Sequence, residues 1–276
     1  MFNMVRMDLY RMFRTKALYV IWIVMALTML LTTALSLMAQ EMPEPQEYIQ
    51  QETEENVNLG MSVSLPTLPE EQITVLDEVY ANTTAKFTAL FLVIFAVLFA
   101  TADINSGYVK NIGGQVPNRG ALFLSKTAAM LVFTALTMIG YVLLQALFCR
   151  ICFGYLVWGN ISALLWYLGI QILLHYALTL ICMAIAVVLR NNVFSMIIVI
   201  CLCGGISALI YGLIDNLMHK LGVQDFQIMK YTVTGQIAMV PLEPSSGDIL
   251  TPAVISVAFL LAMSFIGSTV FAKKDC

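Results

Sequence analysis

Charged side chains are scarce in this chain of 276 residues. Asp, Glu, Lys and Arg make up 11% of it, whereas soluble domains carry about a quarter of such residues. Hydrophobic residues account for 60%, and the mean hydropathy is +0.85. This composition excludes an ordinary soluble domain and predicts an integral membrane protein. With only 14 Lys and Arg against 17 Asp and Glu, no nucleic-acid partner is expected.

Sequence motifs for catalysis and cofactor binding are also missing. The chain has no GxxxxGK[ST] phosphate-binding loop and no HExxH motif, so no ATP or zinc chemistry of those kinds is expected in this chain. Cys149 and Cys152 form a CxxC pair, but two thiols and two distant histidines cannot complete a tetrahedral zinc site. We therefore expect no catalytic site, no metal and no cofactor.

Long apolar runs recur along the chain, and about 20 apolar residues are enough for a helix to cross a bilayer. They predict an all-α fold with six transmembrane helices in a single domain over 1–276. The predicted spans are 17–39, 84–102, 127–149, 161–189, 193–214 and 251–272. The first run lacks a small-x-small cleavage pattern and is predicted to remain as an anchor. Lys86 is expected to extend its ammonium group towards the outer surface from the start of the second span.

Residues 1–16 alternate apolar and basic side chains. Phe2, Val5, Leu9 and Phe13 are interleaved with arginines, which is typical of an amphipathic helix lying on the membrane surface. Residues 215–250 alternate apolar and polar side chains, and we expect this segment to pack on the outer leaflet or dip into it. Both segments complete the predicted layout around the six spans.

The charges are distributed unequally between the two predicted sides. Segment 40–83 holds ten acids and no Lys or Arg, whereas 103–126 holds three basic residues and one acid. By the positive-inside rule, 103–126 and both termini are cytoplasmic and 40–83 is outside. Over the whole layout, ten of the 14 Lys and Arg lie inside.

The polar segment 103–126 has an internal pattern of its own. Gly107 follows Asp103 at i+4, and the pair Gly113 and Gly114 ends any helix that contains Tyr108. The segment resembles the first cytoplasmic loop of ABC-2 type permeases, the membrane subunits of ABC exporters. That loop carries an acid, a glycine a few residues on, and an Arg and a Lys before the third span. The matching residues here are Asp103, Gly107, Arg119 and Lys126.

The resemblance implies that a short coupling helix docks on a separate ABC ATPase, which binds ATP and Mg. The residues implied in this contact are Asp103, Gly107, Tyr108, Val109, Lys110, Ile112, Arg119 and Lys126. It further implies a second permease copy or paralogue, membrane lipid around the spans, and a bacterial-type plasma membrane. The interfacial helix at 1–16 and the semi-apolar segment before the last span are similar to those of the family.

The function implied is outward movement of a hydrophobic or amphipathic substrate. The acids of 40–83 would concentrate a cationic peptide or drug, although a solvated disordered loop would have the same composition. Two other classes stay open: a membrane immunity or scaffold protein without transport, and an ATP-independent secondary transporter.

Two polar stripes within the spans are candidates for lining a pathway. Thr28, Thr32 and Ser36 share a face of the first span. Gln171, His175 and Thr179 follow one another at i, i+4 and i+8 in the fourth, and intramembrane ionisable residues are often functional. The alternatives are a neutral imidazole bonded to a neighbouring helix, and hydroxyls bonded to their own helix backbone.

Overall fold

The computed structural model describes residues 2–41, 65–67, 71–105, 120–223 and 226–273, and within these ranges the secondary structure is entirely helical. The elements are α1 (Phe2–Arg14), α2 (Lys16–Glu41), α4 (Val75–Thr84), α5 (Phe87–Asn105), α7 (Gly120–Cys152), α8 (Ile161–Leu189), α9 (Asn192–Cys203), α10 (Gly205–Lys220), η1 (Ile228–Tyr231), α11 (Val233–Met239) and α12 (Ser246–Lys273). The predicted all-α fold is confirmed.

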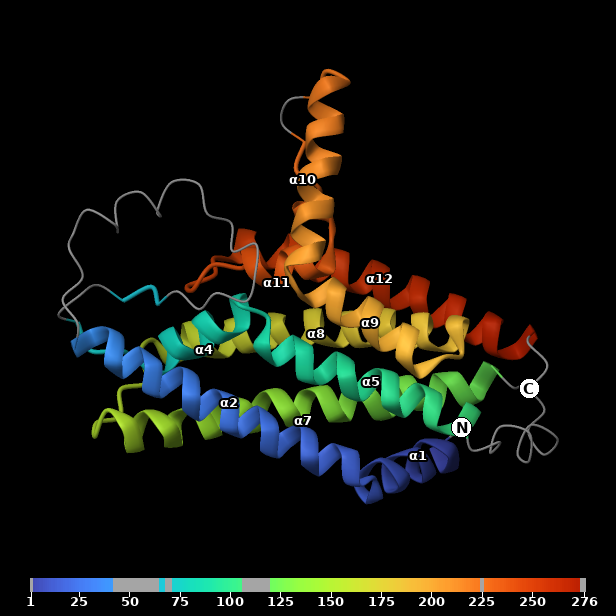
Figure 1. Cartoon of the computed structure of the whole chain (residues 1–276), viewed down its shortest axis with the longest axis horizontal. Coiled ribbons are helices and arrows are strands. Elements are labelled where there is room, and N and C mark those ends of the chain that lie inside the picture. The colour runs from blue at the N-terminus through green and yellow to red at the C-terminus, as the bar shows by residue number, and fades with distance from the viewer. Residues whose placement is uncertain (1, 42–64, 68–70, 106–119, 224–225, 274–276) are drawn as a thin grey trace.

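The long helices lie side by side along the longest axis of the molecule (Figure 1). α8 packs against α5, α7, α9, α11 and α12, and as a helix that is apolar all round it belongs in the interior. α1 lies at one end of this bundle and α4 at the other (Figure 1). We call these the α1 end and the α4 end.

Four helices are long and apolar enough to cross a membrane: α2, α7, α8 and α12. Two further spans are added if the bent pairs α4 with α5 and α9 with α10 each count as one. The protein therefore has four to six candidate spans. The predicted ranges 17–39, 127–149, 161–189 and 251–272 lie within α2, α7, α8 and α12.

The apolar run 193–214 is divided in the structure. α9 ends at Cys203 and α10 begins at Gly205, with an angle of 64° between the two axes. Gly204 has extended backbone angles, φ −84° and ψ −176°, and its N–H still donates to the Ile200 carbonyl oxygen at 2.9 Å. As a result α10 projects away from the bundle (Figure 1). A Cβ atom at Gly204 would lie 3.2 Å from the Ile200 carbonyl oxygen, so the missing side chain relieves crowding at the bend.

A second break separates α4 from α5 by an angle of 55°. Its last residue, Lys86, has a left-handed φ of 63° and is only 2% exposed. The expectation that Lys86 reaches an outer surface is therefore wrong. The break turns this side chain inward, next to Cys203 at the end of α9.

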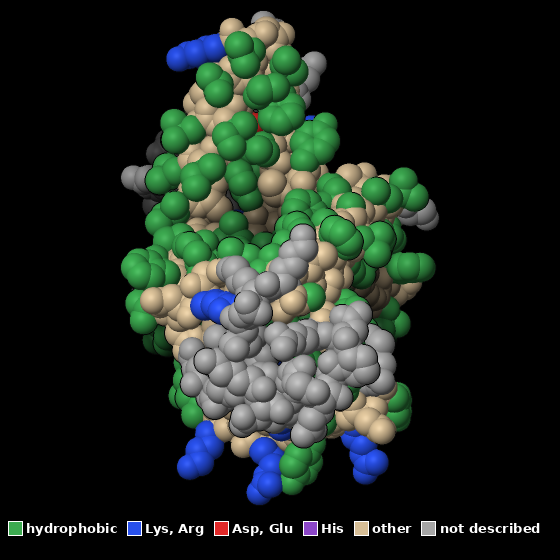
Figure 2. Space-filling model, turned by 90° about the vertical axis from the view of Figure 1, so that its right-hand side faces the viewer, with side chains coloured by type: hydrophobic (Ala, Val, Ile, Leu, Met, Phe, Trp, Pro, Cys, Tyr) green, Lys and Arg blue, Asp and Glu red, His purple; other side chains and the backbone are tan. Residues whose placement is uncertain are grey.

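α1 is amphipathic, as the alternation of its residues predicts. Met12 is buried, whereas Arg6 and Arg14 are exposed. Two residues depart from the pattern, because Asp8 is buried and Phe2 is 84% exposed. One residue, Thr15, separates α1 from α2, and α1 packs on α7. In the view onto the α1 end, Lys and Arg gather at the lower edge, and hydrophobic side chains cover the flanks and the projecting α10 (Figure 2).

Residues 215–250 contain the end of α10, η1, α11 and the start of α12. Gly235 of α11 packs so closely on η1 that a Cβ atom there would lie 2.2 Å from the Met229 carbonyl oxygen. The Gln171 side chain of α8 donates to the Ile237 carbonyl oxygen of α11 at 3.1 Å. These contacts fix α11 against the bundle.

Candidate functional site: a buried carboxylate at the α4 end

The first turn of α4 is fixed by a capping box. The Thr74 hydroxyl accepts from the Asp77 backbone N–H at 3.2 Å, and the Asp77 carboxylate accepts from the Thr74 N–H at 2.9 Å. Such reciprocal bonds satisfy two backbone donors at a helix start. The next residue, Glu78, is completely buried. The cap therefore fixes the start of the helix that carries a carboxylate into the bundle.

Glu78 lies between α2, α4 and α7, where neutral amides are its hydrogen-bond donors. The Asn82 amide donates to Glu78 Oε2 at 3.3 Å, and the Gln145 amide lies 3.5 Å from the same oxygen. Gln145 also donates to the Thr33 hydroxyl at 2.8 Å. The Ser36 hydroxyl is the other polar neighbour.

Within the described part of the chain, Glu78 forms no ion pair, and its Oε1 atom has no hydrogen bond of normal geometry. A carboxylate taken out of water without a cation costs several kcal/mol. Such a residue in a membrane protein is a candidate for binding a proton or a cation. The cluster of Glu78, Asn82, Gln145, Thr33 and Ser36 is called the Glu78 cluster below.

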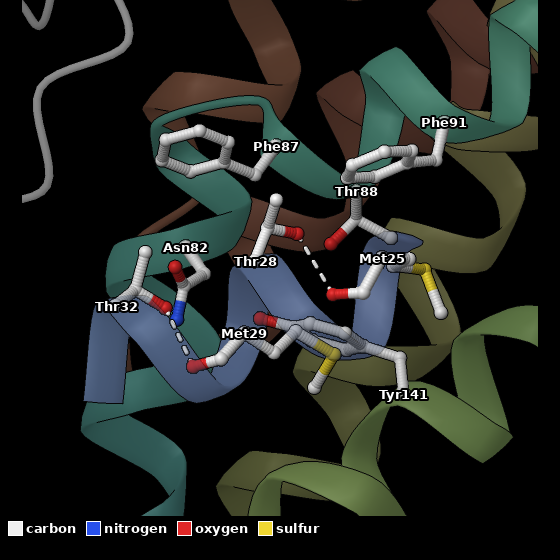
Figure 3. Close-up of a pocket in the computed structure, with 9 residues that line it drawn as sticks. All are labelled: Met25, Thr28, Met29, Thr32, Asn82, Phe87, Thr88, Phe91 and Tyr141. Atoms are coloured by element: carbon white, nitrogen blue, oxygen red, sulfur yellow. Dashed lines mark hydrogen bonds between the residues drawn. The ribbon is translucent and has the colours of Figure 1, made fainter. Parts of the chain in front are cut away.

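A small cavity adjoins this cluster between α2, α4, α5 and α7. Its lining residues are Met25, Thr28, Met29, Thr32, Asn82, Phe87, Thr88, Phe91 and Tyr141 (Figure 3). The volume of about 10 Å³ approaches what one water molecule needs. The Tyr141 hydroxyl lies beside those of Thr83 and Thr88. The cavity is lined mainly by apolar atoms and is too small to admit a substrate.

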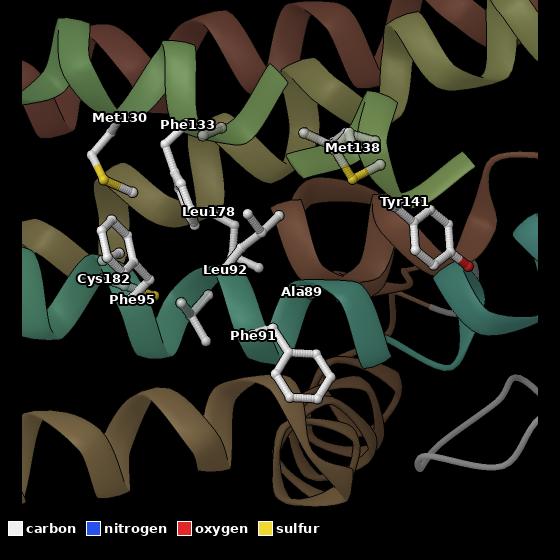
Figure 4. Packing of buried hydrophobic residues seen from close by; sticks show 14 of the residues in the cluster. Ala89, Phe91, Leu92, Phe95, Met130, Phe133, Met138, Tyr141, Leu178 and Cys182 are labelled. Atoms are coloured by element: carbon white, nitrogen blue, oxygen red, sulfur yellow. The ribbon is translucent and has the colours of Figure 1, made fainter. Parts of the chain in front are cut away.

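Packed apolar side chains fill the bundle on the α1 side of this cavity. The rings of Phe95 in α5 and Phe133 in α7 have centroids 4.2 Å apart, and Leu92 and Leu178 are buried beside them (Figure 4). In this conformation the polar region at the α4 end is separated from the α1 end by a dense core.

The first predicted stripe meets the cavity. Thr28 and Thr32 line it, and Ser36 belongs to the Glu78 cluster. The hydroxyls of Thr28 and Thr32 donate to the carbonyl oxygens of Met25 and Met29, at 2.8 and 2.9 Å (Figure 3). These two threonines thus satisfy their own hydroxyls within α2 and present mainly methyl groups to the cavity.

The second predicted stripe does not meet the cavity. Gln171, His175 and Thr179 are completely buried in α8. His175 Nδ1 lies 2.7 Å from the Gln171 carbonyl oxygen, and the Thr179 hydroxyl donates to the Tyr176 carbonyl oxygen at 2.8 Å. His175 Nε2 has no hydrogen-bond partner among the described residues. Within that part of the chain, His175 therefore bonds its own helix and not a neighbouring one, and pathway lining by this stripe stays a prediction.

The predicted coupling residues are mostly outside the described part of the chain. Asp103 belongs to the last turn of α5, and the structure does not describe Gly107, Tyr108, Val109, Lys110, Ile112 or Arg119. Lys126 is 2% exposed. Its Nζ donates to the Phe99 carbonyl oxygen at 3.0 Å and lies 4.3 Å from the centre of the Phe99 ring. This lysine therefore joins α7 to α5 inside the bundle.

A second buried polar group lies beside Lys126. Asp8 of α1 is 3% exposed and accepts a hydrogen bond from the Ser125 hydroxyl of α7. Sequence reasoning did not single out Asp8, Glu78 or Gln145. Gln145 carried a signal, because it is an amide within a predicted span, and such a group needs partners inside the protein.

No group of three or more His, Cys, Asp or Glu in the described ranges could hold a metal ion. Neither protein-family models nor characterised proteins show a significant match to this chain.

Proposed function

We propose that this protein is the membrane-spanning permease subunit of an ATP-driven exporter of the ABC-2 type. The observation that carries the proposal is the pair of broken helices, α4 with α5 and α9 with α10, together with a buried carboxylate in α4. Non-helical backbone at membrane depth is tolerated only inside protein or along a cavity, and transporters use broken helices at their binding sites. The chain has no ATP-binding loop, so the energy comes from a separate ATPase.

In this proposal, segment 103–126 faces the cytoplasm together with both termini and receives the ATPase. The basic residues of α1 and the lack of Lys and Arg in 40–83 support this orientation. A second copy or paralogue completes the transporter in a bacterial-type plasma membrane, and ATP and Mg bind to the partner ATPase. The acidic composition of 40–83 supports a cationic amphipathic peptide or drug as substrate.

The test replaces the apolar edge of the coupling segment. In the double variant Tyr108→Asp/Ile112→Asp, we expect the protein to reach the membrane at normal levels but to lose both stimulation of the ATPase and transport. An apolar edge on a charged loop needs a complementary groove to bury it, and a carboxylate there opposes docking. The control is Tyr155→Asp/Leu156→Asp at the α4 end, which should leave the coupling intact. Unchanged coupling in the first variant would contradict the proposal.

An ATP-independent secondary transporter is the second candidate, and Glu78 favours it. Buried carboxylates in membrane bundles serve as proton-relay groups. Purified protein in liposomes distinguishes the two functions. Substrate movement driven by a pH gradient without any ATPase, and abolished by Glu78→Gln, would establish the second candidate. Movement that requires the ATPase and ATP would exclude it.

A further inference from the structure

A groove of about 290 Å³ opens between α1 and the last turns of α5. It is lined by Tyr10, Arg11, Arg14, Thr15, Phe99 and Ala102. Four of these residues come from α1 and its junction with α2, and two come from α5. The groove is therefore at the α1 end, where the amphipathic helix meets the bundle.

The α1 wall of the groove is polar and positively charged. Arg14 donates to the Tyr10 hydroxyl at 2.8 Å, and its guanidinium carbon lies 5.4 Å from the Tyr10 ring centre. A guanidinium has five N–H donors in a planar fork that matches phosphate. Arg11 brings a second guanidinium to the same wall. Asp8, the acid of α1, is buried and accepts a hydrogen bond from Ser125, whereas Arg6 and Arg14 are exposed.

The α5 wall is apolar and continues along the bundle. Phe99 and Ala102 form this side of the groove. Leu90, Ile94 and Leu98 precede Ala102 at intervals of four residues and are each partly exposed, so they share one face of α5. Beyond the junction at Thr15, the exposed residues Tyr19, Ile23 and Leu27 form a similar row on α2. Apolar surface thus leads away from a site with two guanidinium groups.

We propose that this groove binds the phosphate headgroup of an anionic phospholipid, with the acyl chains lying along the apolar rows of α5 and α2. Each part of such a lipid meets matching chemistry: the phosphodiester meets Arg11 and Arg14, and the glycerol hydroxyls meet Tyr10 and Thr15. A free phosphate ion would use only the polar wall. The site is independent of the transport function proposed above, because it requires neither the ATPase nor a substrate.

The experiment measures lipid retention by the purified protein in detergent, using native mass spectrometry. The probes are dioleoylphosphatidylglycerol and, as the lipid without net charge, dioleoylphosphatidylcholine. One basic side chain near an anionic lipid changes affinity by about fivefold. We therefore expect Arg11→Gln/Arg14→Gln to weaken retention of the anionic lipid by roughly 25-fold. Retention of phosphatidylcholine should change little.

The matched control is Arg6→Gln/Lys16→Gln. These two residues are exposed on the same helix and its junction but do not line the groove. An equal loss of anionic-lipid retention in this control would mean that the lipid is held by the general positive charge of the surface, and would overturn the proposal. Ala102→Trp fills the groove without changing any charge and should also release the lipid. If that variant binds normally, or if millimolar inorganic phosphate displaces the lipid from wild-type protein, the proposal is wrong.

Discussion

The two ends of the bundle differ in how closely their buried charged groups are hydrogen-bonded. At the α1 end, Asp8 is bonded to Ser125, and Lys126 donates to the Phe99 carbonyl oxygen at 3.0 Å while contacting the Phe99 ring. At the α4 end, the amides nearest to Glu78 lie 3.3 and 3.5 Å away, and Glu78 Oε1 lacks a bond of normal geometry. Asp8 and Lys126 thus have close polar partners, whereas Glu78 at the α4 end has longer contacts that a small rearrangement can alter.

α7 connects the two polar regions and sets their separation. Lys126 and Gln145 are 19 positions apart on this helix, which corresponds to about 28 Å at the helical rise. The hydrocarbon core of a bilayer is about 30 Å thick. The Lys126 region and the Glu78 cluster therefore match the two borders of the hydrocarbon, and the dense apolar core between them matches its interior.

The largest effect is expected from Gln145→Leu. This change removes the donor shared by Thr33 and Glu78 and leaves buried acceptors unsatisfied, so we expect a loss of about 2 kcal/mol in the free energy of unfolding. Unfolding in mixed micelles measures it. The control Leu147→Ala, at a residue 51% exposed on the same helix, should lose less than about 0.5 kcal/mol. Equal losses would show that the Glu78 cluster adds nothing to stability.

A pair of isosteric changes tests the comparison directly. Asp8→Asn keeps the shape of the side chain but removes the charge that strengthens its bond to Ser125, so a loss of about 1 kcal/mol is expected. Glu78→Gln removes a buried charge that has no ion-pair partner among the described residues, so unfolding stability should be unchanged or increased. Both values come from the same unfolding experiment. If Glu78→Gln lowered the free energy of unfolding and Asp8→Asn did not, the carboxylate at the α4 end would be the better hydrogen-bonded of the two.

The smallest effect is expected from Thr28→Val and Thr32→Val. Among the described residues, their hydroxyls bond their own helix backbone, so each change should alter the free energy of unfolding by less than about 0.5 kcal/mol. Transport assays then show whether the cavity matters for function. Impaired transport at normal stability would support pathway lining, and a stability loss above 1 kcal/mol would mean that these hydroxyls bond other groups.

The sequence predicts the unbroken helices well, for a clear physical reason. A run of more than 20 apolar residues can satisfy its backbone in a membrane only as a helix, and the runs 17–39, 127–149, 161–189 and 251–272 all lie within single helices. The amphipathic helix α1 is equally predictable from the sequence, because its 3.6-residue pattern depends on local spacing alone.

The breaks and the Glu78 cluster could not be predicted in the same way. The apolar run 193–214 continues through Gly204, so hydropathy does not mark the bend. At the other break, Lys86 takes a left-handed conformation that lysine rarely adopts. Glu78 lies within an acid-rich segment, where composition suggests exposure. Only the packing of α4 onto α7 and α2 shows that this acid is completely buried.

The bend at Lys86 also has a mechanical meaning. Ala85 and Lys86 donate backbone bonds to Ala81 and Thr83, and Lys86 accepts one from Leu90, so the junction is braced and α4 turns with α5. The axes of α4 and α5 meet at 55°, so a rotation of α5 about its own axis would move the far end of α4 sideways. A rotation of α5 by about 10° carries the far end of α4, about 15 Å long, sideways by roughly 2 Å. Such a displacement is large enough to separate Glu78 from the Gln145 amide of α7, whereas Asn82 belongs to α4 and would move with Glu78.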